Sequence, residues 1–139
     1  MNDLIASNKM TSMLIAKVTP GDIPFITSDD KQKGLIYILD AGDSIKIGRT
    51  RNLQQRLPVI IRTSGKHIER IAVSPFCNNY CHIEAYLHRH FSSKRVIGEW
   101  FSVRFDDAVS ELSKCEFDFT VKLPKENKVL KLFEMIIQM

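Results

Sequence analysis

Two short apolar runs separated by a four-residue turn constrain the fold of this chain most strongly. Residues 35–39 (Leu-Ile-Tyr-Ile-Leu) are apolar and rich in β-formers, as expected of a strand that is buried on both faces. Residues 40–43 (Asp-Ala-Gly-Asp) supply turn formers, and residues 44–48 (Ser-Ile-Lys-Ile-Gly) follow as a second strand. The sequence therefore predicts a β-hairpin at the start of the core.

The segments after this hairpin alternate between helical and extended patterns. Asn52 is a credible N-cap for a helix with an apolar face, but Pro58 removes a backbone donor, so we expect this helix to kink or stop early. The elements expected after it are a strand over residues 69–74, a helix over 78–92, an extended piece over 100–103 and a helix over 105–115. Together they predict an α/β (α+β) fold, in which helices flank a small, mainly antiparallel sheet of about three strands.

Both ends of the chain read as additions to a central domain over residues 34–115. Residues 1–33 predict an N-terminal arm, whose apolar residues are roughly helix-spaced until Pro20 and Gly21 stop any helix. Residues 116–139 predict a C-terminal extension with an amphipathic helix from Asn127 onward. This helix could pack on its own domain or on a second subunit, so a homodimer is one expectation.

Composition excludes several classes of protein. The 139 residues include 44% apolar and 26% charged residues, which is typical of one ordinary globular domain. We expect no membrane association, since no run approaches the roughly 18 apolar residues of a spanning helix, and a cytoplasmic location. The three cysteines are an odd number, which argues against a disulfide scaffold. Cys77, Cys81 and His82 leave a zinc site as the alternative to free thiols.

Positive charge is concentrated in one stretch, although the net charge is only +4. Between residues 46 and 70 the single acid is Glu69. The seven basic residues there are Lys46, Arg49, Arg51, Arg56, Arg62, Lys66 and Arg70. Such a strip would attract a phosphate backbone, although basic surfaces without partners are also common.

Five short motifs, in order and spacing, resemble the GIY-YIG nuclease superfamily, in particular its phage-type branch. They are Gly-Leu-Ile-Tyr at 34–37, Lys-Ile-Gly at 46–48, Asn-Leu-Gln-Gln-Arg-Leu at 52–57, the segment 84–91, and Gly-Glu-Trp-Phe at 98–101. The resemblance covers about residues 34–105. Four features depart from the pattern: an extra residue in the first motif, a lysine in place of the second tyrosine, Pro58 in the helix after Arg56, and a late motif without a clear asparagine.

The resemblance implies a catalytic role for the tyrosine and arginine of these motifs. Tyr37 would hold or deprotonate the attacking water, and a neighbouring cation such as Lys46 across the hairpin would help, because a phenol is a poor base at neutral pH. Arg56 would offer a planar fork to two phosphate oxygens. Taken alone, Tyr37 is more simply interpreted as a strand aromatic and Arg56 as an exposed helix residue.

The resemblance also implies a metal site on the following helix. Glu84 would bind Mg²⁺ or Mn²⁺, with waters and phosphate oxygens completing the shell. His88, four residues later on the same helical face, could orient this glutamate, position a water or protonate a leaving group. A surface Glu–His pair is the alternative. Glu99 could brace the site, while Trp100 and Phe101 are expected to close the core.

The basic strip supplies the expected DNA contacts. Arg49 and Arg51 could approach the same phosphate as Arg56, and Arg62 and Lys66 could meet the DNA backbone. The leading interpretation is a metal-dependent DNA endonuclease of a bacterial or phage-infected cell. The alternatives are a non-catalytic DNA-binding module of the same fold and an unrelated interaction protein that uses the helical tail.

Overall fold

The computed structural model describes residues 13–18 and 32–120, which form one antiparallel sheet with three helices. Six strands lie in the order β1-β4-β2-β3-β6-β5. The strands are β1 (Leu14–Lys17), β2 (Leu35–Asp40), β3 (Ile45–Thr50), β4 (Arg70–Val73), β5 (Arg95–Ile97) and β6 (Trp100–Phe101). The helices are α2 (Leu53–Ser64), α3 (Tyr80–His90) and α4 (Phe105–Ser113), with a 3₁₀ turn, η1 (Ser92–Lys94), before β5. The predicted α/β class and antiparallel sheet are confirmed.

Strand β2 lies inside the sheet and is buried along its whole length. It pairs with β3 on one side, where Tyr37 lies opposite Gly48, and with β4 on the other, where Tyr37 lies opposite Val73. The predicted hairpin is therefore present, and β4-β2-β3 are the three strands that the sequence indicated. The sheet extends beyond them, because β1 pairs with β4, and β6 pairs with β3.

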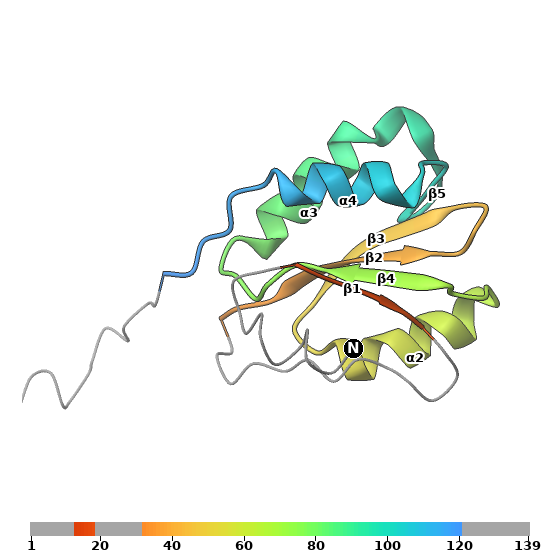
Figure 1. Cartoon of the computed structure of the whole chain (residues 1–139), viewed down its shortest axis with the longest axis horizontal. Helices are drawn as coiled ribbons and strands as arrows, with labels where there is room; N and C mark the ends of the chain where they lie inside the picture. Colours follow the sequence, from red (N-terminus) through yellow and green to blue (C-terminus); the bar gives the residue numbers. More distant parts are fainter. Residues whose placement is uncertain (1–12, 19–31, 121–139) are drawn as a thin grey trace, which may run out of the picture.

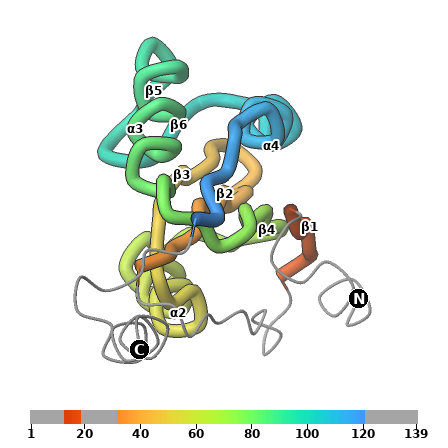
Figure 2. The backbone as a smooth tube through the Cα atoms, turned by 90° about the vertical axis from the view of Figure 1, so that its left-hand side faces the viewer, coloured from red at the N-terminus to blue at the C-terminus, as the bar shows by residue number. Residues whose placement is uncertain are grey.

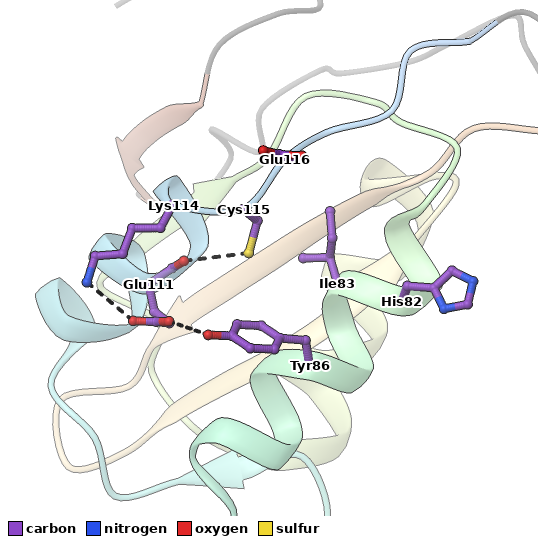
Figure 3. Close-up of a pocket in the computed structure, with 7 residues that line it drawn as sticks. All are labelled: His82, Ile83, Tyr86, Glu111, Lys114, Cys115 and Glu116. Atoms are coloured by element: carbon purple, nitrogen blue, oxygen red, sulfur yellow. Dashed lines mark hydrogen bonds and ion pairs between the residues drawn. The ribbon is translucent and has the colours of Figure 1, made fainter.

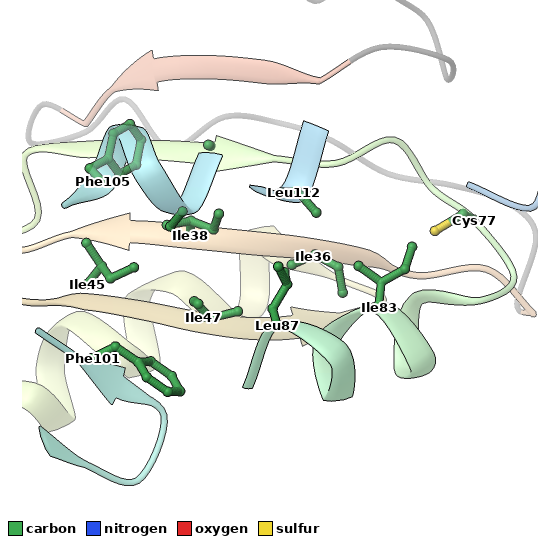
Figure 4. Packing of buried hydrophobic residues seen from close by; sticks show 12 residues of the cluster. Ile36, Ile38, Ile45, Ile47, Cys77, Ile83, Leu87, Phe101, Phe105 and Leu112 are labelled. Carbon is green, nitrogen blue, oxygen red and sulfur yellow. The ribbon is translucent and has the colours of Figure 1, made fainter. Parts of the chain in front are cut away.

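Each face of the sheet carries its own apolar cluster, and Figures 1 and 2 show helices on both faces. One face packs against α2, and Leu35, Tyr37 and Leu39 point toward it. The other face packs against α3 and α4, and Figure 4 shows its core. Residues of β2 therefore alternate between the two clusters, which explains why this strand has no polar side.

Two expectations for these elements are wrong: a helix in the N-terminal arm up to about Val18, and an early stop of the helix that contains Pro58. The helical spacing of the N-terminal arm predicted a helix up to about Val18, yet Leu14–Lys17 form β1, because the backbone there completes the open edge of β4. Helix α2 does not stop at Pro58 but runs to Ser64. Its apolar face is buried on both sides of the proline, which holds the helix together despite the missing donor.

The ends of the chain are only partly described. Residues 116–120 follow α4 and reach the start of α3, where the side chain of Asn79 donates to the carbonyl of Glu116 (2.8 Å). The expected tail helix from Asn127 onward lies outside the described residues, as do residues 1–12 of the arm. In the described part of the chain, no helix is long and apolar enough to cross a membrane.

Candidate active site

The hydroxyl of Tyr37 is held in place by the glycine on the neighbouring strand. Tyr37 is 1% exposed, and its ring lies across Gly48, where a Cβ atom would come within 2.2 Å of the hydroxyl oxygen. Any side chain at position 48 would therefore displace the ring. The glycine of the Lys-Ile-Gly motif therefore helps to position the Tyr37 hydroxyl, because its missing side chain leaves the space that the ring fills.

Burial dominates the chemistry of this phenol. It raises the pKa of Tyr37 to about 12, while a hydrogen bond from Arg56 acts in the opposite direction. The carboxylates of Glu99 and Glu84 raise the pKa of the phenol further. Tyr37 is consequently neutral at pH 7 and suited to hydrogen bonding a water. The cation at its hydroxyl is Arg56 rather than the Lys46 that we expected.

Helix α2 carries Arg56 one turn from its first residue. The N-cap is Asn52, whose side chain accepts from the backbone nitrogen of Gln55 (3.1 Å), as the sequence predicted. The backbone nitrogen of Arg56 donates to the carbonyl of Asn52 (3.1 Å). Arg56 itself is exposed. The capped turn therefore fixes the backbone of an arginine whose side chain reaches the Tyr37 hydroxyl and still faces solvent.

Helix α3 presents Glu84 beside strand β3. The side chain of Glu84 is 14% exposed, and Arg49 of β3 lies 3.7 Å from its carboxylate. Burial raises the pKa of Glu84, the nearby Glu99 raises it further, and His88, Arg49 and Lys46 lower it. The carboxylate is thus a poorly solvated anion whose charge is partly balanced by neighbouring basic side chains, and a metal ion would compete with those side chains for it.

The side chain of His88 is hydrogen-bonded to strand β3. Its Nε2 lies 2.8 Å from the carbonyl of Ile47, so this nitrogen carries the proton and donates to strand β3. The ring also packs on Phe101 at 5.2 Å between centroids. Of the roles expected for His88, this geometry favours positioning α3 and its glutamate over donating a proton from Nε2.

Lys46 and Glu99 form an ion pair across the sheet. Their Nζ–Oε2 distance is 3.0 Å, and the lysine side chain is only 12% exposed. The backbone nitrogen of Ile47 also donates to the Glu99 carbonyl (3.1 Å), which ties the β5–β6 turn to β3. The sequence indicated a bracing role for Glu99. It did not indicate that this carboxylate would meet Lys46 and act electrostatically on both Tyr37 and Glu84.

Five groups thus converge, four from separate elements and one from the β5–β6 turn: Tyr37, Lys46, Arg56, Glu84 and Glu99. Residues 34–116, more than half of the chain, match the T5orf172 domain family. The chain belongs to this family. The T5orf172 domain is a phage-associated domain of the GIY-YIG or nuclease-like type, which is consistent with a nuclease or DNA-binding role. The comparisons with curated proteins and with solved structures gave no match.

The donor atoms of the T5orf172 domain fit a hard divalent cation only in part. Among the described residues there is no group of three or more His, Cys, Asp or Glu side chains that could hold a metal ion. Mg²⁺ needs no such cage, because it is commonly bound by one or two carboxylates with waters and phosphate oxygens. Glu84, with Glu99 in electrostatic reach, matches that requirement, provided that DNA supplies the remaining oxygens.

The expected DNA-binding residues of this T5orf172 domain are not equivalent. Arg51 and Arg62 are exposed, and Arg49 is 47% exposed beside Glu84. Lys66 is partly engaged, since its Nζ lies 3.5 Å from Asp43 and 5.2 Å from the centroid of Trp100. Acids from outside the strip therefore neutralise part of its charge, an effect that residue counting between positions 46 and 70 missed.

A separate cavity of about 270 Å³ lies between α3 and α4 (Figure 3). The Tyr86 hydroxyl donates to Glu111 (2.6 Å), and Lys114 lies 3.5 Å from the same carboxylate. These polar groups satisfy one another, and none of the predicted site residues lines the cavity. It is therefore not part of the candidate active site.

Proposed function

We propose that this protein is a metal-dependent DNA endonuclease that hydrolyses phosphodiester bonds through a GIY-YIG-like site. One observation carries the proposal: the Tyr37 hydroxyl, fixed over Gly48, shares its surroundings with Arg56, Glu84 and Glu99. A neutral hydroxyl, a planar cation and two carboxylates in one place are suited to phosphate chemistry, because hydrolysis needs a positioned water and neutralisation of the phosphate charge.

Each side chain has a distinct part in the proposed reaction. Arg56 binds the non-bridging oxygens of the scissile phosphate with its planar guanidinium. Tyr37, which is neutral because its pKa is about 12, orients the attacking water by a hydrogen bond. Lys46 donates to oxygen atoms whose negative charge grows as the water attacks phosphorus and the bond to the leaving oxygen breaks. His88 holds Glu84 in position through its contact with β3.

Glu84 is the residue that would hold Mg²⁺ or Mn²⁺, with Glu99 as a second carboxylate nearby. The ion, when bound, would act as a Lewis acid toward the phosphate and lower the pKa of a bound water. Arg49 lies 3.7 Å from this carboxylate and would compete with the ion for it. An arginine displaced by the ion would be free to meet a DNA phosphate.

A non-catalytic DNA-binding module of the same fold is the second candidate, and one observation favours it. Without DNA the site neutralises itself, since Lys46 is paired with Glu99 and Arg49 lies beside Glu84. Tyr37 is also only 1% exposed. A site of this kind can keep its basic surroundings for binding DNA while its reactive groups stay engaged with one another.

Cleavage of plasmid DNA distinguishes the two candidates. We expect the wild type to cut with Mg²⁺ or Mn²⁺ and to stop in chelator. Glu84→Gln keeps size but loses the charge that holds the ion, so cleavage should fall by orders of magnitude, while DNA binding in chelator stays equal or tightens. Arg56→Ala should weaken cleavage and binding together, and Tyr37→Phe should affect cleavage alone.

Glu116→Gln is the matched control, because it makes the same charge change at an exposed residue outside the site. Its cleavage rate should equal that of the wild type. A wild type that binds DNA but cuts with neither ion would establish the binding module instead. Rapid cleavage by Glu84→Gln would show that the metal residue is assigned incorrectly, even in a nuclease.

A further inference from the structure

Strand β5, at one edge of the sheet, exposes two neighbouring apolar side chains. Val96 is 63% exposed and Ile97 is 72% exposed. Val96 lies at an irregularity in the β5–β6 pairing, between Arg95 opposite Phe101 and Ile97 opposite Trp100, and the described part of the chain covers neither side chain. Apolar residues on an edge strand favour aggregation. Their presence here is explained if this strand faces a ligand during function.

The β5–β6 hairpin is a built element rather than a loose loop. The backbone nitrogen of Ser102 donates to the carbonyl of Lys94 (2.8 Å), and the guanidinium of Arg95 lies 5.2 Å from the Phe101 ring centroid. The turn uses Gly98, whose φ of 55° lies in the left-handed region that glycine adopts easily. The two apolar side chains are therefore held at a fixed position beside the candidate active site.

The charges around this hairpin match a polyanion. Lys94 and Arg95 precede the apolar pair and are exposed. The single acid of the turn, Glu99, is already paired with Lys46 at 3.0 Å. A surface with basic residues next to aliphatic ones complements DNA, in which phosphates flank the apolar sugar walls and base steps of a groove.

The residues of β5 also indicate which groove. Val96 and Ile97 have no donor or acceptor with which to read the distinct base patterns of the major groove. The minor groove, in contrast, attracts arginine and lysine and is opened by aliphatic side chains that insert between base pairs. These chemical features favour contact with the shape of DNA over hydrogen-bonded reading of base edges by β5.

We propose that the β5–β6 hairpin enters the minor groove of duplex DNA, where Val96 and Ile97 partly unstack a base step beside the scissile phosphate. This inference rests on the proposed function for the identity of the ligand. It also adds a substrate preference. Pyrimidine–purine steps such as TA and CA unstack most easily, so DNA that contains them should bind more tightly than stiff A-tracts.

The test uses the full chain, in chelator, with duplexes that carry 2-aminopurine at a central TA step. The wild type should raise 2-aminopurine fluorescence on binding, because the base loses its stacking. Val96→Ser with Ile97→Ser should abolish this rise and weaken binding about tenfold, the loss expected for about one aliphatic side chain left unburied. Val96→Thr with Ile97→Thr, which keeps β-branching, should also reduce both the fluorescence rise and the affinity.

Ile15→Ser is the matched control, because Ile15 is also an exposed aliphatic residue (48%) but lies on β1, at the opposite edge of the sheet. It should leave binding and fluorescence unchanged. Wild-type fluorescence and affinity in both double variants would overturn the inference and leave the proposed function standing. A double variant that instead loses a dimer, measured by mass in solution, would overturn it in favour of a contact between copies.

The same assay separates failure of this inference from failure of the proposed function. Binding with unstacking but without cleavage in Mg²⁺ or Mn²⁺ would support the hairpin and reject the nuclease. Wild type that binds no duplex at low salt would reject both. Equal affinity for TA-containing and A-tract duplexes would contradict the proposed preference for deformable steps.

Discussion

Gly48 and Tyr37 act as a pair, because the ring of one fills the space left by the missing side chain of the other. A Cβ at position 48 would lie 2.2 Å from the tyrosine hydroxyl and 2.3 Å from its Cζ atom. The ring is buried in the α2 cluster and has little room to shift. The position of the hydroxyl therefore depends on a residue that takes no part in the chemistry.

Gly48→Ala should consequently cost about 1–3 kcal/mol of unfolding free energy, as overpacking of a tight core does. Cleavage should fall as well, because the hydroxyl must move. Urea denaturation measures the first effect. In a Tyr37→Leu background the ring is absent, so the same alanine should cost less. Equal costs in the two backgrounds would mean that the ring is not the obstacle.

Ionised Glu84 lowers the stability of the folded protein, although the proposed function needs its negative charge. Its pKa is raised above the ordinary 4.5, chiefly by burial and then by Glu99, although His88, Arg49 and Lys46 act in the opposite direction. The folded state therefore holds the proton more tightly than the unfolded state. As pH rises from below 4.5 through the raised pKa, the protein loses the corresponding stability.

Glu84→Gln does not ionise and should escape this loss. We expect a higher melting temperature than wild type at pH 7, and a difference that shrinks toward zero as pH falls below 4.5. Thermal denaturation followed by circular dichroism across this range measures it. Glu116→Gln should track the wild type throughout. A Glu84→Gln protein that is less stable at pH 7 would show that the contact with Arg49 outweighs burial.

At the scale of elements, the strands that could be predicted are those whose burial is visible in their own composition. The apolar run at 35–39 has to be buried, either as a strand or as part of a helix. The turn residues that follow it favour a strand in a hairpin. β1 has only four residues, and its burial is limited to Leu14. It becomes a strand through its pairing with β4, a contact between distant segments that local spacing does not contain.

The candidate site divides in the same way. The order of Tyr37, Arg56 and Glu84 could be predicted because each residue belongs to a local motif. The approach of Glu99 to Lys46 depends on the register of β3 with β6, where Lys46 lies opposite Trp100. The sequence also could not show that burial would raise the pKa of Tyr37 rather than let a lysine lower it. Tertiary packing determines both the Lys46–Glu99 contact and the pKa of Tyr37.

Helix α2 links stability to the site through its first turn. The Asn52 side chain caps the helix at the nitrogen of Gln55, one residue before Arg56. Asn52→Ala should cost about 1 kcal/mol of unfolding free energy and loosen the arginine, so cleavage and DNA affinity should both decrease. Asn52→Asp keeps a capping oxygen and should restore stability. Loss of stability in both variants would refute capping as the cause.

At the scale of the whole molecule, the helices that cover the two faces of the sheet differ in charge. Helix α2 covers one face and carries Arg62, whereas α3 and α4 cover the other, where Lys114 lies 3.5 Å from Glu111 (Figure 1). Net charge alone, at +4, would not distinguish these sides. DNA held at the candidate active site should therefore respond to charges on α2 more than to those on α4.

Salt dependence tests this asymmetry. Each phosphate neutralised by a basic side chain contributes about 0.9 to the slope of log affinity against log salt, because bound counterions are released. Arg62→Ala should weaken duplex binding across all sequences and reduce the slope by about 0.9, without altering any sequence preference.

Lys66→Ala should also weaken binding and reduce the slope, but less strongly, since Lys66 lies 3.5 Å from Asp43. Lys114→Ala removes the same charge at the C-terminal end of α4 and should leave the slope unchanged. Anisotropy titrations between low and moderate salt measure these slopes, and a flat wild-type response would reject the nucleic-acid assignment.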